Sequence, residues 1–170
     1  FHFRLIGYSA EAFLDHLDSV GFNHFILLDR RNRLRKIISS VIAHSRDGDY
    51  HIGSERSARL TKAHVNIDDL RIDFDSKPLI EYLADYDREM HGLETLLRRR
   101  NVLRLTYEDD VREDPRKAYS RVCDFLRLRA TSVSAKLSRT NPFPLEDMIE
   151  NFDEVKQTLA GTPYEWMLED

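Results

Sequence analysis

A dense group of cations lies early in the chain. Five of the seven residues from Arg30 to Lys36 are cationic, although the 170-residue chain has a formal net charge of -4. Arginine can donate two hydrogen bonds at once to a phosphate, because its guanidinium group is planar. Ser39 follows Arg31 by eight residues and can add a hydroxyl donor. These residue types predict a site for a phosphate-like anion, with Arg30, Arg31 and Ser39 as candidate ligands.

The segments on either side of these cations predict a strand that leads into a helix. Phe25 to Leu28 is a continuous apolar run, as expected for a strand of a parallel sheet that is covered on both faces. Apolar residues then recur with helical spacing at Leu34, Ile37, Ile38, Val41 and Ile42. Ligands of open α/β sheets lie at the carboxyl edge of the strands, near the amide groups that begin the next helix. We therefore expect backbone N–H groups to join the anion site.

The other charged residues of this helix have a simpler interpretation. Arg33, Arg35 and Lys36 are expected to share its solvated face. A solvated helix face, or a nonspecific stripe for nucleic acid, is also the simplest alternative for the cationic group as a whole.

Strand and helix patterns alternate along the chain, which predicts an α/β domain with a parallel sheet flanked by helices. Residues 3–8 suit a strand, and Ser9 can cap a helix that stops at Gly21. His44 to Asp75 has poor periodicity and is expected to be a loop with short helical pieces. The later predicted segments are a long helix opened by Ser76 and Pro78, a strand from Val102 to Thr106, a helix capped by Asp114 and Pro115, a basic linker from Arg127, a helical stretch from Leu145 to Leu159 interrupted near Asn151, and a tail after Gly161.

Length and composition predict one globular domain over residues 1–170. Hydrophobic residues make up 41% and charged residues 33%, which excludes a disordered or fibrous chain. The single cysteine, Cys123, permits no intrachain disulfide, which fits a reducing cytoplasm. It lies in an apolar helical pattern and is interpreted as buried filler. No apolar run approaches the length of a membrane span.

Two acidic pairs suggest a different chemistry. Some glycosyltransferases hold a metal-bound sugar nucleotide with a D-x-D motif, because two nearby carboxylates can share a hard cation. Such a short pattern commonly arises by chance. The pairs are Asp47-Gly48-Asp49 and Asp73-Phe74-Asp75, and the histidines His44, His51 and His64 lack zinc-motif spacing. The chain contains no Gly-rich loop of the Walker type.

Several short motifs, in their order and spacing, resemble the C-terminal two thirds of a sulfotransferase that uses PAPS (3'-phosphoadenosine 5'-phosphosulfate). The motifs are Arg31-Asn32 after a strand, Ser39 on the next helix, Tyr107-Glu108-Asp109, Asp114-Pro115, Phe125-Leu126 and Asn151 to Val155. The resemblance covers nearly the whole chain. It implies the P-loop NTPase/kinase-like fold that sulfotransferases share.

The resemblance also implies roles for particular residues. In that family an arginine at the end of a strand and a serine on the next helix hold the 3'-phosphate of the donor, which implies this role for Arg31 and Ser39. Lys136 and Arg139 would close over the same phosphate, as a C-terminal loop does in several relatives. The 5'-phosphosulfate loop would have to precede Phe1, so the fold is expected to be N-terminally incomplete, with its catalytic residues unknown and upstream. The family requires no metal.

The implied reaction is transfer of a sulfuryl group from PAPS to a hydroxyl or amine of a small-molecule or glycan acceptor, such as a carbohydrate or lipid-linked glycan. A cytoplasmic protein without a nucleic-acid partner is expected. Two alternatives stay open at this point: another nucleotide-dependent transferase, either kinase-like or a D-x-D glycosyltransferase, and a non-catalytic remnant that acts as an interaction module. The acceptor and the oligomeric state are not determined by these motifs.

Overall fold

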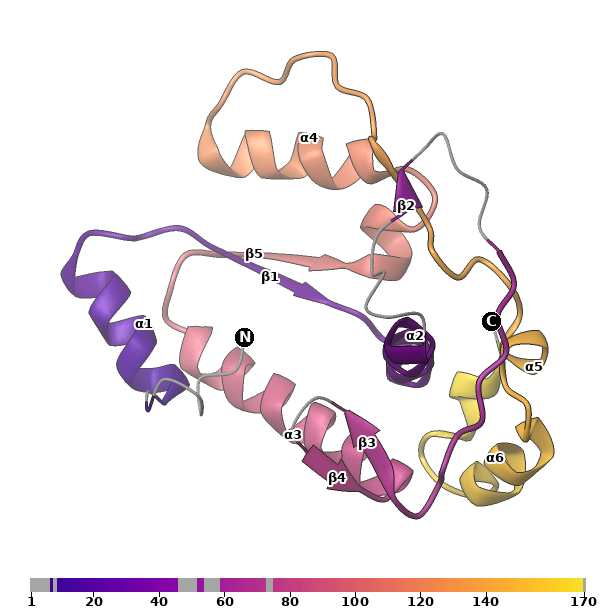
Figure 1. Ribbon diagram of the computed structural model, residues 1–170. Helices are drawn as coiled ribbons and strands as arrows, with labels where there is room; N and C mark the ends of the chain where they lie inside the picture. Colours follow the sequence, from indigo (N-terminus) through magenta and orange to yellow (C-terminus); the bar gives the residue numbers. More distant parts are fainter. Residues whose placement is uncertain (1–6, 8, 46–51, 54–58, 73–74, 170) are drawn as a thin grey trace. The chain divides into compact units, whose positions relative to one another are not determined.

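A computed structural model gives the mixed α/β structure in Figure 1. The residues that it describes are 7, 9–45, 52–53, 59–72 and 75–169. These residues group into two compact units. Unit 1 comprises Phe1–Asp29 and Asp87–Val133, and unit 2 comprises Arg30–Tyr86 and Ser134–Asp170. Each unit is built from two distant stretches of chain, and the single domain over residues 1–170 stays a prediction.

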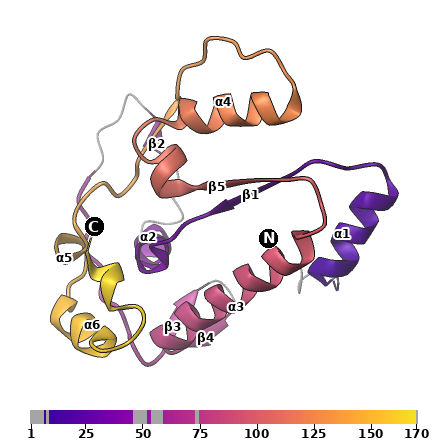
Figure 2. The ribbon, with the colours of Figure 1, turned by 180° about the vertical axis from the view of Figure 1, so that it is seen from behind.

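Unit 1 contains a small parallel sheet. Strand β1 (Phe25–Asp29) pairs with β5 (Val102–Thr106) in register, Phe25 opposite Val102 and Asp29 opposite Thr106. The two strands lie side by side in Figure 1 and, seen from behind, in Figure 2. Both predicted strands and their parallel direction are confirmed. The predicted strand within residues 3–8 lies outside the described residues.

One face of β1 is more open than the sequence predicts. Ile26 and Leu28 are 45% and 52% exposed, whereas Phe25 and Leu27 are half-buried. Alternate residues of a strand share a face, so the two exposed side chains lie together. The prediction that β1 is covered on both faces is therefore wrong for the described part of the chain, where the sheet has only two strands.

The helices of unit 1 begin at the caps that the sequence predicts. Helix α1 (Ala10–Ser19) begins after Ser9, whose hydroxyl accepts the Ala12 N–H at 3.0 Å. Helix α4 (Pro115–Leu126) begins after Asp114, whose carboxylate accepts the Arg116 N–H at 3.0 Å. Such side chains satisfy amides that have no partner within the helix. One π-helical turn, η2 (Tyr107–Val111), connects β5 to α4.

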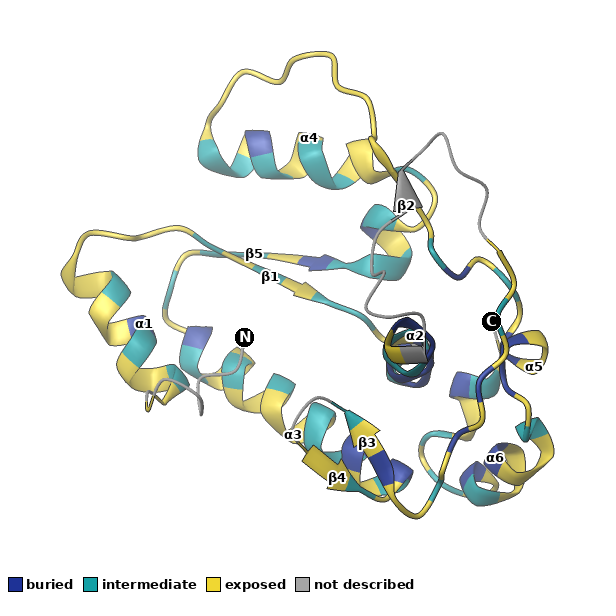
Figure 3. Ribbon diagram, in the orientation of Figure 1, coloured by how far each residue is buried: buried dark blue, intermediate teal, exposed yellow. Residues whose placement is uncertain are grey.

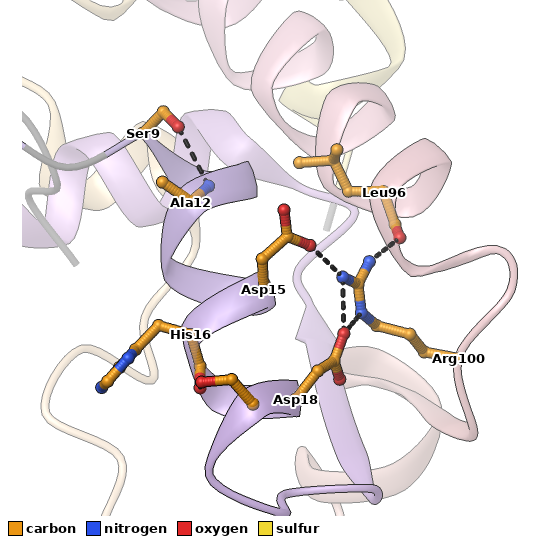
Figure 4. Close-up of polar contacts among 8 residues, drawn as sticks. Ser9, Ala12, Asp15, His16, Asp18, Leu96 and Arg100 are labelled. Carbon is orange, nitrogen blue, oxygen red and sulfur yellow. Dashed lines mark hydrogen bonds and ion pairs between the residues drawn. The ribbon is translucent and has the colours of Figure 1, made fainter.

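Arg100 joins α1 to the segment that ends helix α3 (Leu79–Leu97), as Figure 4 shows. Its guanidinium donates to Asp15 at 2.8 Å, to Asp18 at 2.8 Å and to the Leu96 carbonyl at 2.5 Å. The side chain of Arg100 is only 18% exposed, although those of the two aspartates are 67% and 42% exposed. The hydrogen bond to Asp18 raises the pKa of Arg100, which keeps the guanidinium charged.

We expect Arg100→Ala to lower the free energy of unfolding of unit 1 by about 1 kcal/mol, because the two carboxylates that it binds are largely solvated. Urea unfolding followed by circular dichroism measures this change. High salt should reduce the difference, since salt screens exposed charges. The neighbouring Arg99 is exposed, and Arg99→Ala is the control, with a change below about 0.5 kcal/mol. Equal effects of the two substitutions would contradict this role of Arg100.

Unit 2 has its own hydrophobic core. Helix α2 (Arg33–Ser45) lies in this core, and Figure 3 colours much of it as buried. Leu34, Ile38 and Ile42 are each 0% exposed, as helical spacing predicts. The other elements are the first part of α3, the hairpin of β3 (Leu70–Ile72) and β4 (Asp75–Lys77), the pair β2 (Ile52–Gly53) and β6 (Leu137–Ser138), α5 (Leu145–Met148), α6 (Phe152–Leu159) and η3 (Glu165–Leu168).

Three predictions for unit 2 need correction. Of the loop predicted from His44 to Asp75, the described residues 59–72 contain strand β3 and a parallel bridge of Ala63 with Ile149 and no helical piece, whereas residues 46–51, 54–58 and 73–74 lie outside the described residues. Ser76 lies in β4 rather than at the start of α3, and its hydroxyl donates to Asp69. The predicted tail contains η3, whose Met167 is buried in the core. For Ala63 and Met167 a partner distant in sequence decides the local structure, whereas Ser76 belongs to a local hairpin.

The interruption between α5 and α6 is confirmed, and Asn151 lies at its end, before the first residue of α6. Its side chain accepts the Val65 N–H and donates to the Val65 carbonyl, both at 2.9 Å. The helix itself ends before this residue, because α5 stops at Met148 and Ile149 is extended where the backbone bridges Ala63. Among the described residues, no helix is both long and apolar enough to cross a membrane.

Candidate functional site

All five predicted anion-site residues belong to unit 2. Arg30 and Arg31 precede α2, Ser39 lies on α2, and Lys136 and Arg139 flank β6. Arg31, Lys136 and Arg139 are exposed, whereas Arg30 and Ser39 are half-buried. The three exposed cations are thus accessible to a dissolved anion.

Asn32 caps the start of α2. Its side-chain oxygen accepts the Arg35 N–H at 2.9 Å, and its amide nitrogen donates to the Met167 carbonyl at 2.8 Å. The Arg33 N–H donates to the Arg31 carbonyl at 3.0 Å. Two of the amides that we expected to face the anion therefore have partners within the protein. For these two amides the expectation is wrong.

The start of α2 is electrostatically unusual. Its first turn contains Arg33, Arg35 and Lys36 and no acidic residue. The N-terminus of a helix carries a partial positive charge, so cations there repel the helix dipole and one another. A bound anion at this end would offset both repulsions.

Arg35 differs most from its predicted environment. It is only 5% exposed, so the prediction that it is solvated is wrong. Its Nη2 donates to the carbonyls of Asn141 and Phe143, at 3.0 and 2.6 Å. The helical spacing contains a signal for this burial, because Arg35 precedes the core residues Ile38 and Ile42 by three and seven positions. Two backbone carbonyls replace the water that the guanidinium loses on burial.

The other cations of this turn are less buried. Lys36 is exposed, as predicted, and its ammonium lies 4.5 Å from the centroid of the Tyr86 ring. Arg33 is half-buried, and its Nη1 donates to the Arg31 carbonyl at 3.1 Å. This hydrogen bond fixes the backbone of Arg31 and leaves the position of the Arg31 guanidinium to other contacts.

The basic segment that carries Lys136 and Arg139 is held in unit 2 at two places. Strand β6 pairs antiparallel with β2, with Ser138 opposite Ile52 and Leu137 opposite Gly53. The residues that follow are bound by Arg35 on α2. The segment that carries Lys136 and Arg139 is therefore tied to the helix that carries Ser39.

Unit 1 contains a buried carboxylate that the sequence did not single out. Asp110 in η2 is 7% exposed. It accepts the Thr106 N–H at 2.8 Å and a hydrogen bond from Arg121 at 2.5 Å. The bond from the Thr106 amide, and then that from Arg121, hold the pKa of Asp110 below its ordinary value. The neighbouring Asp109 accepts from the Thr106 hydroxyl at 2.9 Å.

We expect Asp110→Asn to destabilise unit 1 by about 2 kcal/mol at pH 7, because it removes a charged acceptor from two donors. A carboxyl whose folded pKa lies below the unfolded value stabilises the fold above the unfolded value, about 3.9. That contribution is lost as the pH falls through the lower, folded pKa. The difference between wild type and Asp110→Asn should therefore shrink from pH 5 to pH 2.

Urea unfolding at several pH values, followed by circular dichroism, measures this difference. Asp124 is an exposed carboxyl in α4, the helix that carries Arg121. Asp124→Asn is the control and should show a small difference throughout. A difference for Asp110→Asn that stays constant between pH 7 and pH 2 would contradict the proposed contribution of the charge.

The remaining candidates have ordinary environments where the structure describes them. Cys123 is buried, as predicted. Asp75 forms an ion pair with Lys77 at 3.0 Å, while Asp47, Asp49, His51 and Asp73 lie outside the described residues. His44 and His64 are exposed. Within the described ranges, no group of three or more histidine, cysteine or acidic residues is arranged to hold a metal ion.

Unit 2 thus presents exposed cations before α2 and around β6, with a hydroxyl on α2 itself. Guanidinium, ammonium and hydroxyl groups are the usual side-chain ligands of a phosphate. We compared the chain with protein-family models, with curated proteins and with solved structures. None of the three comparisons gave a match.

Proposed function

We propose that this chain is a PAPS-dependent sulfotransferase domain in which Arg31 and Ser39 hold the 3'-phosphate of the donor. The observation that carries the proposal is the excess of positive charge at the start of α2. Arg31 and Lys36 are exposed there, and the first turn contains no acidic residue. A phosphate dianion would relieve the repulsion between these cations and the helix dipole.

The positions along α2 are compatible with one phosphate. Ser39 follows Asn32 by seven residues, which corresponds to about 10 Å along a helix axis. Arg31 precedes the helix, and its side chain can extend along part of this distance, so the proposed phosphate would lie between its guanidinium and the Ser39 hydroxyl. In the proposed site Lys136 and Arg139 approach the same phosphate from the segment that Arg35 ties to α2. The segment supplies positive charge, and α2 supplies the hydroxyl.

The proposed reaction moves a sulfuryl group from PAPS to an acceptor hydroxyl or amine by in-line displacement. The acceptor oxygen or nitrogen forms a bond to sulfur and gives its proton to a general base, the bond from sulfur to the 5'-phosphate oxygen breaks, and PAP (adenosine 3',5'-bisphosphate) leaves. Arg31 and Ser39 hold the donor in place and take no part in bond formation, so their contribution is positioning. The P-loop kinase-like fold, the cytoplasmic location and a small-molecule or glycan acceptor belong to the same proposal. The general base is not assigned to a residue of this chain.

Calorimetric titration with PAP tests the proposal directly. We expect PAP to bind at least about tenfold more tightly than 5'-AMP, because the 3'-phosphate adds charge-assisted hydrogen bonds. Adenosine 2',5'-bisphosphate has the same charge and should bind more weakly than PAP, which separates a shaped site from general attraction. Equal affinity for the two bisphosphates, or no binding of PAP, would overturn the proposal. Manganese-dependent binding of a sugar nucleotide would support the glycosyltransferase alternative instead.

A further inference from the structure

We propose that Arg35 is a positioning residue, which fixes the segment 134–143 so that Lys136 and Arg139 can reach an anion bound at Ser39. The ligand in this inference rests on the proposed function. The anchoring of the segment by Arg35 rests on contacts in unit 2 alone.

The guanidinium of Arg35 is buried and bonded to backbone carbonyls. Arg35 is 5% exposed, and its Nη2 donates both of its N–H groups, to Asn141 at 3.0 Å and to Phe143 at 2.6 Å. Both acceptors are backbone carbonyls, so the contact depends on the path of the chain and not on the side chains there. A planar guanidinium can hold two such carbonyls at fixed angles, which a lysine ammonium does less well.

The segment that Arg35 holds is mostly exposed. Every residue from Ser134 to Arg139 is exposed, and Leu137 is 60% exposed. Pairing of β6 with β2 spans only two residues. Burial begins at Asn141, which is 8% exposed, and Phe143 packs against the core. Arg35 therefore acts at the point where an exposed segment enters the core.

Arg35 lies on α2 between the proposed phosphate ligands Arg31 and Ser39 in sequence. It lies four residues after Arg31 and four before Ser39. Residues four apart on a helix are neighbours on one face, so Arg35 and Ser39 lie one turn apart. A single buried side chain thus connects the helix that carries the proposed hydroxyl ligand to the segment that carries two proposed cationic ligands.

Hydrogen exchange without ligand tests the anchoring. In Arg35→Met, which keeps most of the apolar stem, those amides of residues 134–143 that are protected in the wild-type chain should exchange at least about tenfold faster, because the Asn141 and Phe143 carbonyls lose their donor. Amides of α6 should change much less, and Arg35→Lys should be intermediate. Leu34→Ala is the control for general destabilisation of unit 2, and it should raise exchange in both regions alike. Unchanged exchange of residues 134–143 in Arg35→Met would overturn the inference.

A double-mutant cycle tests the positioning. Arg35→Met should weaken PAP binding about tenfold in the wild-type background, which is about 1.4 kcal/mol. In a Lys136→Ala/Arg139→Ala background the same substitution should change PAP affinity less than about twofold, because Arg35 acts through these two cations. Equal losses in both backgrounds would overturn the positioning role.

The two proposals can fail separately. Selectively faster exchange in Arg35→Met, together with no PAP binding by the wild-type chain, would overturn the sulfotransferase proposal and support the anchoring. Tight PAP binding that depends on Arg31, together with unchanged exchange in Arg35→Met, would support the sulfotransferase proposal and overturn the role of Arg35.

Discussion

Replacing Arg31 by alanine is expected to weaken PAP binding by about 10- to 100-fold, because hydrogen bonds to a charged phosphate each contribute about 1.5–3 kcal/mol. Arg31 is exposed, so its side chain can be removed without a cavity in the core. The backbone contact of its carbonyl with the Arg33 N–H does not depend on the side chain. Binding of 5'-AMP should change less than about twofold, since this ligand has no 3'-phosphate.

Calorimetry with both nucleotides measures this difference for each variant. Arg31→Lys should retain part of the affinity, because it keeps the charge and loses the planar pair of donors. Ser39→Ala should cost about fivefold, as expected for one hydroxyl hydrogen bond to a charged group. Lys156→Ala, which removes an exposed cation from α6, is the matched control for net charge. Equal losses in Arg31→Ala and Lys156→Ala would show that PAP responds only to overall charge.

Replacing Leu34 by alanine is expected to lower the free energy of unfolding of unit 2 by about 2–5 kcal/mol. Leu34 is 0% exposed in the core, on the first turn of α2. Its truncation removes apolar contacts and leaves a cavity that close-packed neighbours fill only in part. Because α2 carries Ser39 and unit 2 carries the other proposed phosphate ligands, the same substitution should also weaken PAP binding near the unfolding midpoint.

Urea unfolding followed by tryptophan fluorescence suits this measurement. Trp166 is the single tryptophan of the chain and lies in η3, which contacts α2. Leu137→Ala is the matched control, because Leu137 belongs to the same unit and is 60% exposed. Its effect should stay below about 0.5 kcal/mol. Similar effects at the two leucines would contradict the core position of Leu34.

Local sequence signals determined much of the secondary structure. Ser9 and Asp114 were recognised as helix caps because a cap bonds an amide only two or three residues away. The core face of α2 followed from helical spacing, and the bounds of β5 from alternation in Val102–Thr106. These features depend on neighbours along the chain, so the residues themselves contain the necessary information. The sequence also indicated candidate ligands of a phosphate, whose binding role stays a prediction. These are Arg31, Ser39, Lys136 and Arg139.

Tertiary contacts decided the rest. Arg35 has the composition of a solvated residue, yet it is buried because carbonyls 106 and 108 positions away accept its hydrogen bonds. Asn32 belongs to the Arg31-Asn32 motif, and only the folded chain shows that its amide also attaches η3 to α2 through a carbonyl 135 positions away. The open face of β1 depends on the number of strands beside it, which apolar character alone does not specify. A side chain's type limits which partners it can have, but only the folded chain determines which of them lies within hydrogen-bonding distance.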